Sequence, residues 1–215
     1  MGAGAVSVGR LITCDADVAE GAQWLAAHEP RFDHALRATG PLPLRLRPAG
    51  FEALLRAIVS QQVSVASASA ISGRMEQAGL IAPEAILQAG EEGLRAAGLS
   101  RQKIRYALAL SEAGIDFDAL ARLPDAEVIE TLTALPGIGP WTAQVYAMFS
   151  LGRRDVFAPG DLALQEAARA LFELEARPTP AALARMAAPW SPWRAVAARL
   201  LFAYYRVSSK REGIA

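Results

Sequence analysis

The stretch Leu135-Pro136-Gly137-Ile138-Gly139-Pro140-Trp141-Thr142-Ala143 decides the fold of this chain. It follows a helix-like run over residues 125–133 and precedes a second over residues 141–149. Its two glycines let the backbone turn sharply where a side chain would clash, and Pro140 opens the next helix at a position where its missing N–H costs nothing. The pattern predicts a tight hairpin with backbone N–H groups at a helix N-terminus, which suit a phosphate. By itself, Gly-x-Gly between helices is more often only a turn.

Composition favours a helical protein built as one large domain or two small lobes. The chain has 215 residues, 53% of them apolar, with much alanine and few β-branched runs. Such a composition favours packed helices over sheets. No apolar run reaches the roughly 18 residues that cross a bilayer, and the N-terminus carries no secretory signal. We therefore expect a cytoplasmic protein without membrane association.

The content of cysteine, histidine and charged residues restricts the chemistry. The single cysteine, Cys14, rules out an intramolecular disulfide and a four-cysteine iron–sulfur cluster. His28 and His34 are six residues apart, a poor spacing for one helix face, so we expect no metal site there and no cofactor. The 22 basic and 22 acidic residues cancel, which argues mildly against nucleic-acid binding by counterion release. Backbone N–H groups and helix N-termini also hold phosphates, however.

Three separated motifs carry a resemblance to a known family. Residues 135–143 resemble the hairpin of the helix-hairpin-helix (HhH-GPD) DNA glycosylases, and Asp155-Val156-Phe157-Ala158-Pro159-Gly160-Asp161 resembles the Gly/Pro-rich loop and closing aspartate of that superfamily. Within it, these two motifs and Pro192-Trp193-Arg194 most resemble the bacterial 3-methyladenine DNA glycosylase II group. The resemblance runs from about residue 51 to about residue 205. It implies an all-α fold of about ten helices in two lobes with a central cleft.

The helical pattern divides the chain into three expected parts. Residues 1–45 are expected to hold a short lead and helices that pack on the core, residues 46–207 the glycosylase core, and residues 208–215 a frayed tail. Many members of the resembled group carry an additional N-terminal sheet domain. Because only about 45 residues precede the core here, that domain is expected to be absent or reduced.

The resemblance implies a partner, double-stranded DNA with damaged bases, and a set of residues that contact it. The hairpin residues assigned to DNA binding are Pro136, Gly137, Ile138, Gly139 and Thr142. Gln62 matches the residue that enters the duplex where the target base leaves, and Gln61 beside it is assigned to the substrate pocket. Without the resemblance, the two glutamines are more simply polar residues at a helix break. We expect the protein to act as a monomer.

Basic residues near the start of the helix expected over residues 101–113 have two interpretations. Arg101, Lys103 and Arg105 suit contacts to phosphates. A solvated helix face is the commoner explanation for such residues.

One aspartate is the candidate catalytic residue. Breaking an N-glycosidic bond builds positive charge on the sugar, and an ionised carboxylate in a low-dielectric site stabilises that charge. Asp161 matches the catalytic aspartate of the family. Its structural alternative is to cap the helix that begins at Leu162, and both roles are compatible. Asp155 competes for the catalytic role but matches a supporting position of the motif.

The pocket residues implied by the resemblance point to a monofunctional enzyme for alkylated purines. Trp141 stands where bifunctional relatives place the lysine that forms a Schiff base, and an indole cannot form an imine. Its ring suits a cationic alkylated purine, by stacking and by cation–π attraction. Trp193 matches a second aromatic of the pocket, although tryptophans in helical proteins usually pack in the core. Val145 and Leu162 replace tyrosines of some members, which leaves uncharged lesions such as hypoxanthine or etheno adducts open.

The superfamily also implies an ion at the hairpin. Its members often bind a monovalent cation, sodium or potassium, through backbone carbonyl groups. The matching positions are Thr133, Leu135 and Ile138. Carbonyl ligation leaves almost no signature in a sequence, so this ion follows from the resemblance alone.

The residues and the resemblance leave three functions open. The first is a monofunctional alkylbase glycosylase, and the second is a glycosylase of the same superfamily for an oxidised or mismatched base. The third is a non-catalytic module that uses the hairpin only to hold phosphates. The missing lysine and cysteines disfavour the second, and Asp161 after Pro159-Gly160 disfavours the third, because phosphate binding alone needs no carboxylate.

Overall fold

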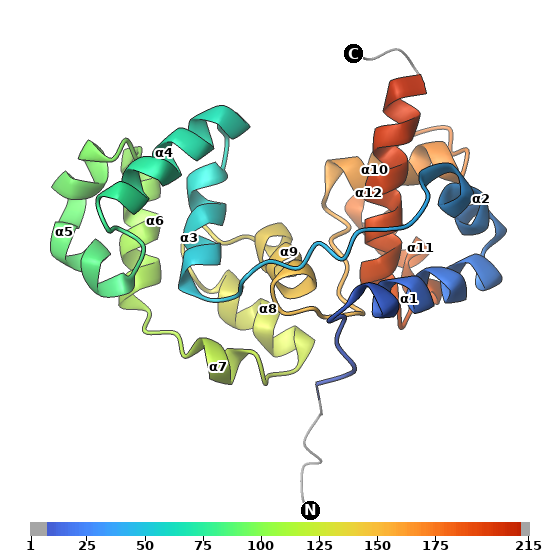
Figure 1. The fold of residues 1–215 in the computed structure, drawn as a ribbon, viewed down its shortest axis with the longest axis horizontal. Coiled ribbons are helices and arrows are strands. Elements are labelled where there is room, and N and C mark those ends of the chain that lie inside the picture. Colours follow the sequence, from blue (N-terminus) through green and yellow to red (C-terminus); the bar gives the residue numbers. More distant parts are fainter. Residues whose placement is uncertain (1–7, 212–215) are drawn as a thin grey trace, which may run out of the picture. The chain divides into compact units, whose positions relative to one another are not determined.

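The computed structural model describes residues 8–211, and helices are the regular elements in that range. The α-helices are α1 (Asp15–His28), α2 (Pro30–Thr39), α3 (Phe51–Ser60), α4 (Val65–Gln77), α5 (Pro83–Ala96), α6 (Arg101–Glu112), α7 (Phe117–Leu120), α8 (Asp125–Thr133), α9 (Pro140–Phe149), α10 (Leu162–Leu171), α11 (Pro180–Met186) and α12 (Arg194–Arg211), with one 3₁₀-helix, η1 (Ala188–Trp190) (Figure 1). Over the described range the only β pairing is an isolated antiparallel bridge between Leu11 and Arg153. The predicted all-α fold is confirmed.

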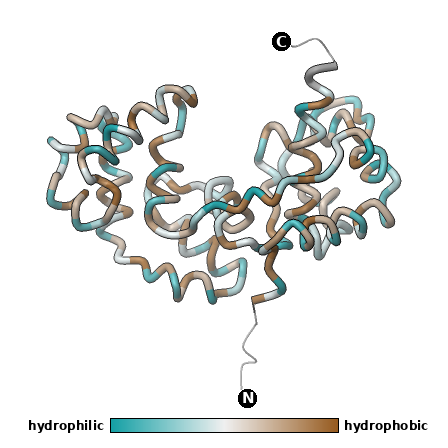
Figure 2. Tube along the Cα trace, in the orientation of Figure 1, coloured by the Kyte–Doolittle hydropathy of each residue, from teal (hydrophilic) through white to brown (hydrophobic). Residues whose placement is uncertain are grey.

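The described residues form two compact units. Residues 47–146 make the first, and residues 8–46 and 147–211 make the second. Within each unit, hydrophobic and hydrophilic residues alternate along the helices (Figure 2), as amphipathic helices around a core require. None of the helices described over residues 8–211 has the length and apolar character needed to span a membrane.

This division differs from the expected one, which separated residues 1–45 from a core over residues 46–207. In the structure α1 and α2 pack on α12, at the other end of the sequence, and so belong to the same unit as the C-terminal helices. The expected tail also begins too early, because α12 continues past residue 207 to Arg211. The remaining tail residues 212–215, and the first seven residues of the expected lead, lie outside the described range.

A buried arginine holds three segments of the second unit together. Arg199 on α12 is 1% exposed, and burial lowers its pKa to about 10. Its guanidinium donates to the carbonyl oxygens of Leu44 at 3.0 Å, Ala195 at 2.9 Å and Met148 at 3.4 Å. It also lies 4.8 Å from the centre of the Phe149 ring. These contacts offset the cost of a buried charge, and they anchor the C-terminal end of α9.

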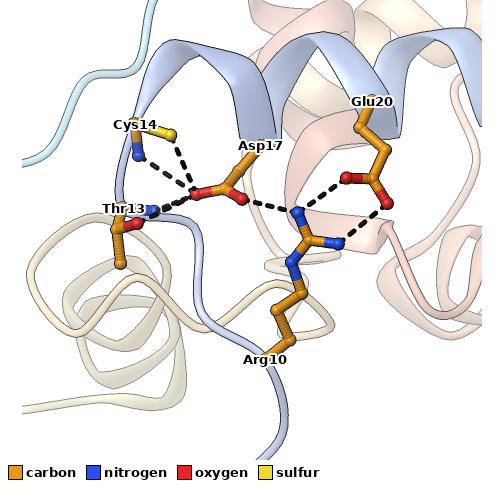
Figure 3. Close-up of polar contacts among 5 residues, drawn as sticks. All are labelled: Arg10, Thr13, Cys14, Asp17 and Glu20. Carbon is orange, nitrogen blue, oxygen red and sulfur yellow. Dashed lines mark hydrogen bonds and ion pairs between the residues drawn. The ribbon is translucent and has the colours of Figure 1, made fainter.

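A carboxylate in the first turn organises the start of α1 (Figure 3). One oxygen of Asp17 accepts hydrogen bonds from the backbone N–H groups of Thr13 and Cys14, at 2.8 and 3.2 Å. The other accepts from Arg10 at 2.7 Å, and Arg10 also pairs with Glu20. The Thr13 N–H and then the Arg10 guanidinium hold the pKa of Asp17 well below its usual range. Cys14 is the N-cap residue of α1, and Asp17 stands at the third position of the helix.

We predict that Asp17→Asn makes the stability of the protein less sensitive to acid. Because the folded-state pKa is lowered from 3.8, the carboxylate stabilises the fold above about pH 4, and this contribution is lost as the pH falls further. The variant should be less stable than the parent by about 0.5–1 kcal/mol at pH 7, and the difference should shrink towards pH 3. Urea unfolding at pH 7, 5, 4 and 3 measures it, with the exposed Asp118→Asn as control. A difference that is constant with pH would contradict the role of the charge.

Candidate functional site

The predicted hairpin joins α8 to α9 within the first unit. Helix α8 ends at Thr133 and α9 begins at Pro140, as the sequence pattern predicts. The turn between them is closed by the Ile138 N–H, which donates to the Leu135 carbonyl at 3.1 Å. The Ile138 side chain is buried in the core, whereas Pro136 and Gly139 are exposed. The hairpin therefore presents backbone, more than side chains, to its surroundings.

The two hairpin glycines are required for different reasons. Gly137 has φ of +87°, which L side chains rarely adopt, and a Cβ there would overlap the ring of Tyr106 from α6. Gly139 shows no positive φ, and a Cβ there would meet no atom within 4 Å. Packing within the protein thus explains Gly137 but not Gly139. A bare, exposed backbone at Gly139 suits the close approach of an external group such as a phosphate.

The joint between α3 and α4 is tied to this hairpin. The Gln61 side-chain amide donates to the Gly137 carbonyl oxygen at 2.8 Å. Gln62, the residue predicted to enter the duplex, is exposed and has φ of +55°. Gln61 and Gln62 therefore lie in the same unit as the hairpin, and the Gln61 amide group, predicted for the substrate pocket, binds the hairpin backbone.

Lys103 has a role that neither interpretation of its sequence foresaw. It is buried, and its Nζ donates to the Val59 carbonyl at the end of α3 at 2.6 Å. Burial lowers the pKa of this ammonium group. Lys103 is thus not on a solvated face, where Arg101 and Arg105 of the same helix do lie. The sequence did hold a signal for this position. Arg101 and Arg105 are four residues apart on one face of α6, so Lys103 between them points to the opposite, inner face.

A pocket opens beside Gln62 within the first unit. Its volume is about 240 Å³, and polar side chains from the α3–α4 joint and from α6 form much of its lining. The lining residues are Gln61, Gln62, Val63, Ile71, Gly98, Ser100, Gln102, Lys103 and Tyr106. The pocket therefore adjoins both the predicted wedge and the ring that packs under the hairpin.

The first turn of α9 carries the aromatic residue predicted for the substrate. Trp141 is 46% exposed, a high value for so large an apolar side chain. Val145, one turn later, is half-buried. Thr142 is 7% exposed, so its side chain contributes to the core, and its contact with DNA stays a prediction.

The candidate catalytic aspartate lies in the second unit, where it caps α10. One carboxylate oxygen of Asp161 accepts hydrogen bonds from the backbone N–H groups of Ala163 at 2.9 Å and Leu164 at 3.1 Å. The predicted capping role of Asp161 is confirmed. Leu162, next in the chain, is 60% exposed. The cap holds a half-buried carboxylate at a helix N-terminus, where the helix dipole favours negative charge.

Asp155 is engaged in a different way, by an ion pair. Its carboxylate accepts from the Nε and Nη2 of Arg194, both at 2.8 Å, and from the Ser191 hydroxyl at 2.8 Å. Burial acts to raise the pKa of Asp155, but the hydrogen bonds and charge of Arg194 and the Ser191 hydroxyl outweigh it and hold the pKa below its usual range. The residue links the loop before Asp161 to the start of α12, as a supporting residue would.

Trp193, the second predicted pocket aromatic, is packed inside its own unit. It is 3% exposed, and a Cβ added at Gly21 of α1 would come within 2.6 Å of its ring. The guanidinium groups of Arg10 and Arg154 lie 5.7 and 5.2 Å from the ring centre. In this structure, cationic groups of the protein itself already lie over the indole.

The hairpin carbonyls predicted to bind a monovalent cation have the oxygen chemistry that such an ion requires. The Leu135 carbonyl accepts the turn hydrogen bond from Ile138, and a carbonyl oxygen has a second lone pair for a further ligand. The carbonyl groups are therefore compatible with such an ion, whose binding stays a prediction.

The chain is similar to a known family and to several known proteins. Residues 55–192 match the family described as HhH-GPD superfamily base excision DNA repair protein. The DNA-3-methyladenine glycosylase 1 of Schizosaccharomyces pombe is 34% identical over 161 residues, covering 71% of this chain and 71% of that protein. The crystal structure of DNA-3-methyladenine glycosidase from Bacillus halodurans is similar with a TM-score of 0.79 and 35% identity, covering 89% of this chain and 91% of that chain. The structure of the S. pombe 3-methyladenine DNA glycosylase in complex with abasic DNA is similar with a TM-score of 0.76 and 28% identity, covering 89% of this chain and 97% of that chain.

We predict that the two hairpin glycines separate stability from DNA binding. Gly137→Ala should lower the free energy of unfolding by about 1–3 kcal/mol, because it overpacks against Tyr106 at a positive φ. Gly139→Asp should fold normally and weaken binding to duplex DNA by at least about tenfold, through bulk and through charge repulsion. Melting curves and fluorescence anisotropy measure the two effects.

Gln77→Glu is the matched control for the added charge, since Gln77 is an exposed residue of the same unit. Its affinity for DNA should stay within about twofold of the parent's. A folded Gly139→Asp protein that binds DNA as well as the control does would show that the hairpin is not the DNA anchor.

Proposed function

The chain belongs to the HhH-GPD superfamily of base excision DNA repair proteins, and on that premise we propose that it is a DNA glycosylase that removes alkylated purines of the 3-methyladenine type from double-stranded DNA. The observation that carries this proposal is that the chain has both an exposed hairpin backbone at Gly139 and a helix-capping carboxylate at Asp161. The similar proteins named 3-methyladenine glycosylases support the substrate class.

DNA is held mainly by uncharged backbone in this proposal. With 22 basic and 22 acidic residues, the chain has no net charge to drive counterion release. The N-terminal end of α9 follows the exposed Gly139, so the helix dipole and the hairpin N–H groups together attract a phosphate. Carbonyl ligation of a monovalent cation by Thr133, Leu135 and Ile138 would add a positive charge at the same place.

The target base must leave the stack before it can be cleaved, which costs a few kcal/mol. Gln62 is exposed at the α3–α4 joint, in the unit that contains the hairpin. Its amide can fill the gap in the duplex and hydrogen-bond the unpaired base. In this proposal the hairpin holds the DNA backbone, and Gln62 keeps the gap in the duplex open.

Cleavage is hydrolytic in this proposal, with Asp161 as the catalytic residue. As the N-glycosidic bond breaks, positive charge develops on the sugar, and the carboxylate stabilises it while helping to position water. The cap by Ala163 and Leu164 N–H groups fixes the carboxylate before the reaction begins. Trp141 takes the place of the lysine that would attack the sugar, so the DNA strand stays intact and the product is an abasic site.

Trp141 supports a cationic purine as the leaving base. Its exposed indole can stack on a flipped base, and a ring-methylated purine gains a cation–π attraction of about 0.5–2 kcal/mol. The aliphatic side chains of Val145 and Leu162 add shape without charge selection. Because some members have tyrosines at these positions, uncharged lesions such as hypoxanthine and etheno adducts stay open as a second class of substrate.

We predict the outcome of one assay on a panel of duplexes. Methylated DNA should lose 3-methyladenine, single-lesion duplexes with hypoxanthine or ethenoadenine should react more slowly, and 8-oxoguanine should not be released. Every product strand should remain intact until it is treated with alkali. Gel analysis with and without alkali measures both results. Nicked strands before that treatment, or a protein–DNA adduct trapped by borohydride, would contradict the monofunctional mechanism.

We predict that Asp161→Asn slows base release by at least about a hundredfold. An asparagine oxygen can still cap α10, but the negative charge facing the developing cation is lost, and one preorganised electrostatic group commonly contributes about 3–4 kcal/mol. Melting temperature should barely change, and DNA binding should persist. Single-turnover rates on methylated duplex and melting curves measure these effects.

Asp155→Asn is the matched variant, because it also removes one carboxylate charge from the same loop. It breaks the bidentate pair with Arg194, and so should lower stability by about 1.5–3 kcal/mol. If Asp161→Asn releases bases at the parental rate, Asp161 is not the catalytic residue.

A further inference from the structure

Two contacts, one from α6 and one to the hairpin, fix the end of α3, where the predicted wedge begins. Lys103 of α6 donates from Nζ to the Val59 carbonyl, one residue before the last residue of α3. A cation at this position satisfies a carbonyl that the helix leaves unpaired and favours the negative end of its dipole. Two residues after Val59, the Gln61 side chain reaches the Gly137 carbonyl in the hairpin.

The hairpin is fixed from the same helix, α6. The ring of Tyr106 lies so close to Gly137 that no Cβ fits between them. The Tyr106 hydroxyl accepts a hydrogen bond from the Gln102 amide at 2.6 Å, which holds the ring in place. One face of α6 therefore supports both the hairpin and the α3–α4 joint, and Gln61 closes the connection between them.

Gln62 needs such support. It is not a glycine, yet its φ is +55°, a conformation that costs about 1–3 kcal/mol and persists only where the surroundings impose it. The neighbouring residue is bonded to the hairpin by a side chain, so the direction in which Gln62 leaves α3 is set relative to the hairpin backbone. The amide nitrogen of Gln61 is occupied in this contact and is directed to the protein.

We propose that Gln61 is a positioning residue, which fixes Gln62 in register with the phosphate-binding hairpin, and not a residue that contacts the excised base. The inference rests on the proposed function, because the position of Gln62 relative to the hairpin matters only if the hairpin holds DNA while Gln62 enters the duplex. A displacement of about 1 Å between groups that act together on one substrate can cost on the order of a hundredfold in rate.

The test uses two variants of the full chain that remove the hydrogen-bond donor in different ways. Gln61→Glu keeps the shape but sets a carboxylate against the Gly137 carbonyl, and Gln61→Leu keeps most of the volume without polarity. Gln77→Leu, on the exposed end of α4, is the matched control. Both Gln61 variants should fold, with melting temperatures lowered by only about 2–4 °C.

The readout is the single-turnover release of 7-methylguanine from two duplexes, one with cytosine opposite the lesion and one with an abasic-site analogue opposite it. On the paired lesion both Gln61 variants should be slower than the parent by at least about tenfold. Opposite the abasic analogue little unpairing is needed, so their rates should return to within about threefold of the parent's. The control variant should match the parent on both duplexes.

Three outcomes would overturn the proposal. If both Gln61 variants lose the same factor in rate on the two duplexes, Gln61 contacts the excised base. If Gln61→Leu is slow while Gln61→Glu releases the base at the parental rate, Gln61 acts through packing. If both variants react at the parental rate, Gln61 has no role in the reaction. A parent that releases no base from these duplexes or from methylated DNA refutes the proposed function instead. In that case, hydrogen exchange at the backbone amides of residues 62 and 63 tests whether the hydrogen bond from Gln61 to Gly137 fixes the α3–α4 joint. Faster exchange in both Gln61 variants than in Gln77→Leu supports the fixed joint, and unchanged exchange overturns it.

Discussion

The contact between the Gly137 backbone and the Tyr106 ring is the constraint on which the candidate site depends. It admits no side chain, and Gly137 has a φ of +87° that a side chain would strain. Because Tyr106 belongs to α6, the hairpin is placed by that helix as well as by α8 and α9. The same helix holds the end of α3 through Lys103. With the inner side of the hairpin fixed in this way, Gly139 is left as exposed backbone that nothing inside the protein requires.

Local signals in the sequence predicted the elements of the site well. The hairpin begins and ends where its glycines and Pro140 place it, and Asp161 caps α10 as its position before Leu162 predicts. Both features depend on residues within a few positions of one another, where the preferences for caps and turns act. The specific role of each residue in binding and catalysis rests on the family resemblance.

Contacts between distant residues could not be predicted from the sequence. The hydrogen bond from Gln61 to Gly137 spans 76 positions, and the one from Arg199 to Leu44 spans 155. Neither a glutamine at a helix break nor an arginine in an alanine-rich helix indicates a partner so far away. For the same reason the union of α1 and α2 with α12 escaped the expected domain division. Lys103 is a partial exception, because its position between Arg101 and Arg105 indicates the inner face of α6, although both interpretations of the sequence put it on the surface.

Much of the positive charge of this chain is committed to its own structure. Lys103 and Arg199 bind backbone carbonyls in the interior, and Arg194 and Arg10 pair with carboxylates. Charges held in this way contribute little to counterion release, in a chain whose formal charges already cancel. Oriented backbone dipoles can add to the binding of DNA without changing this charge balance. The proposed function therefore assigns a DNA phosphate to the exposed backbone at Gly139, at the N-terminal end of α9.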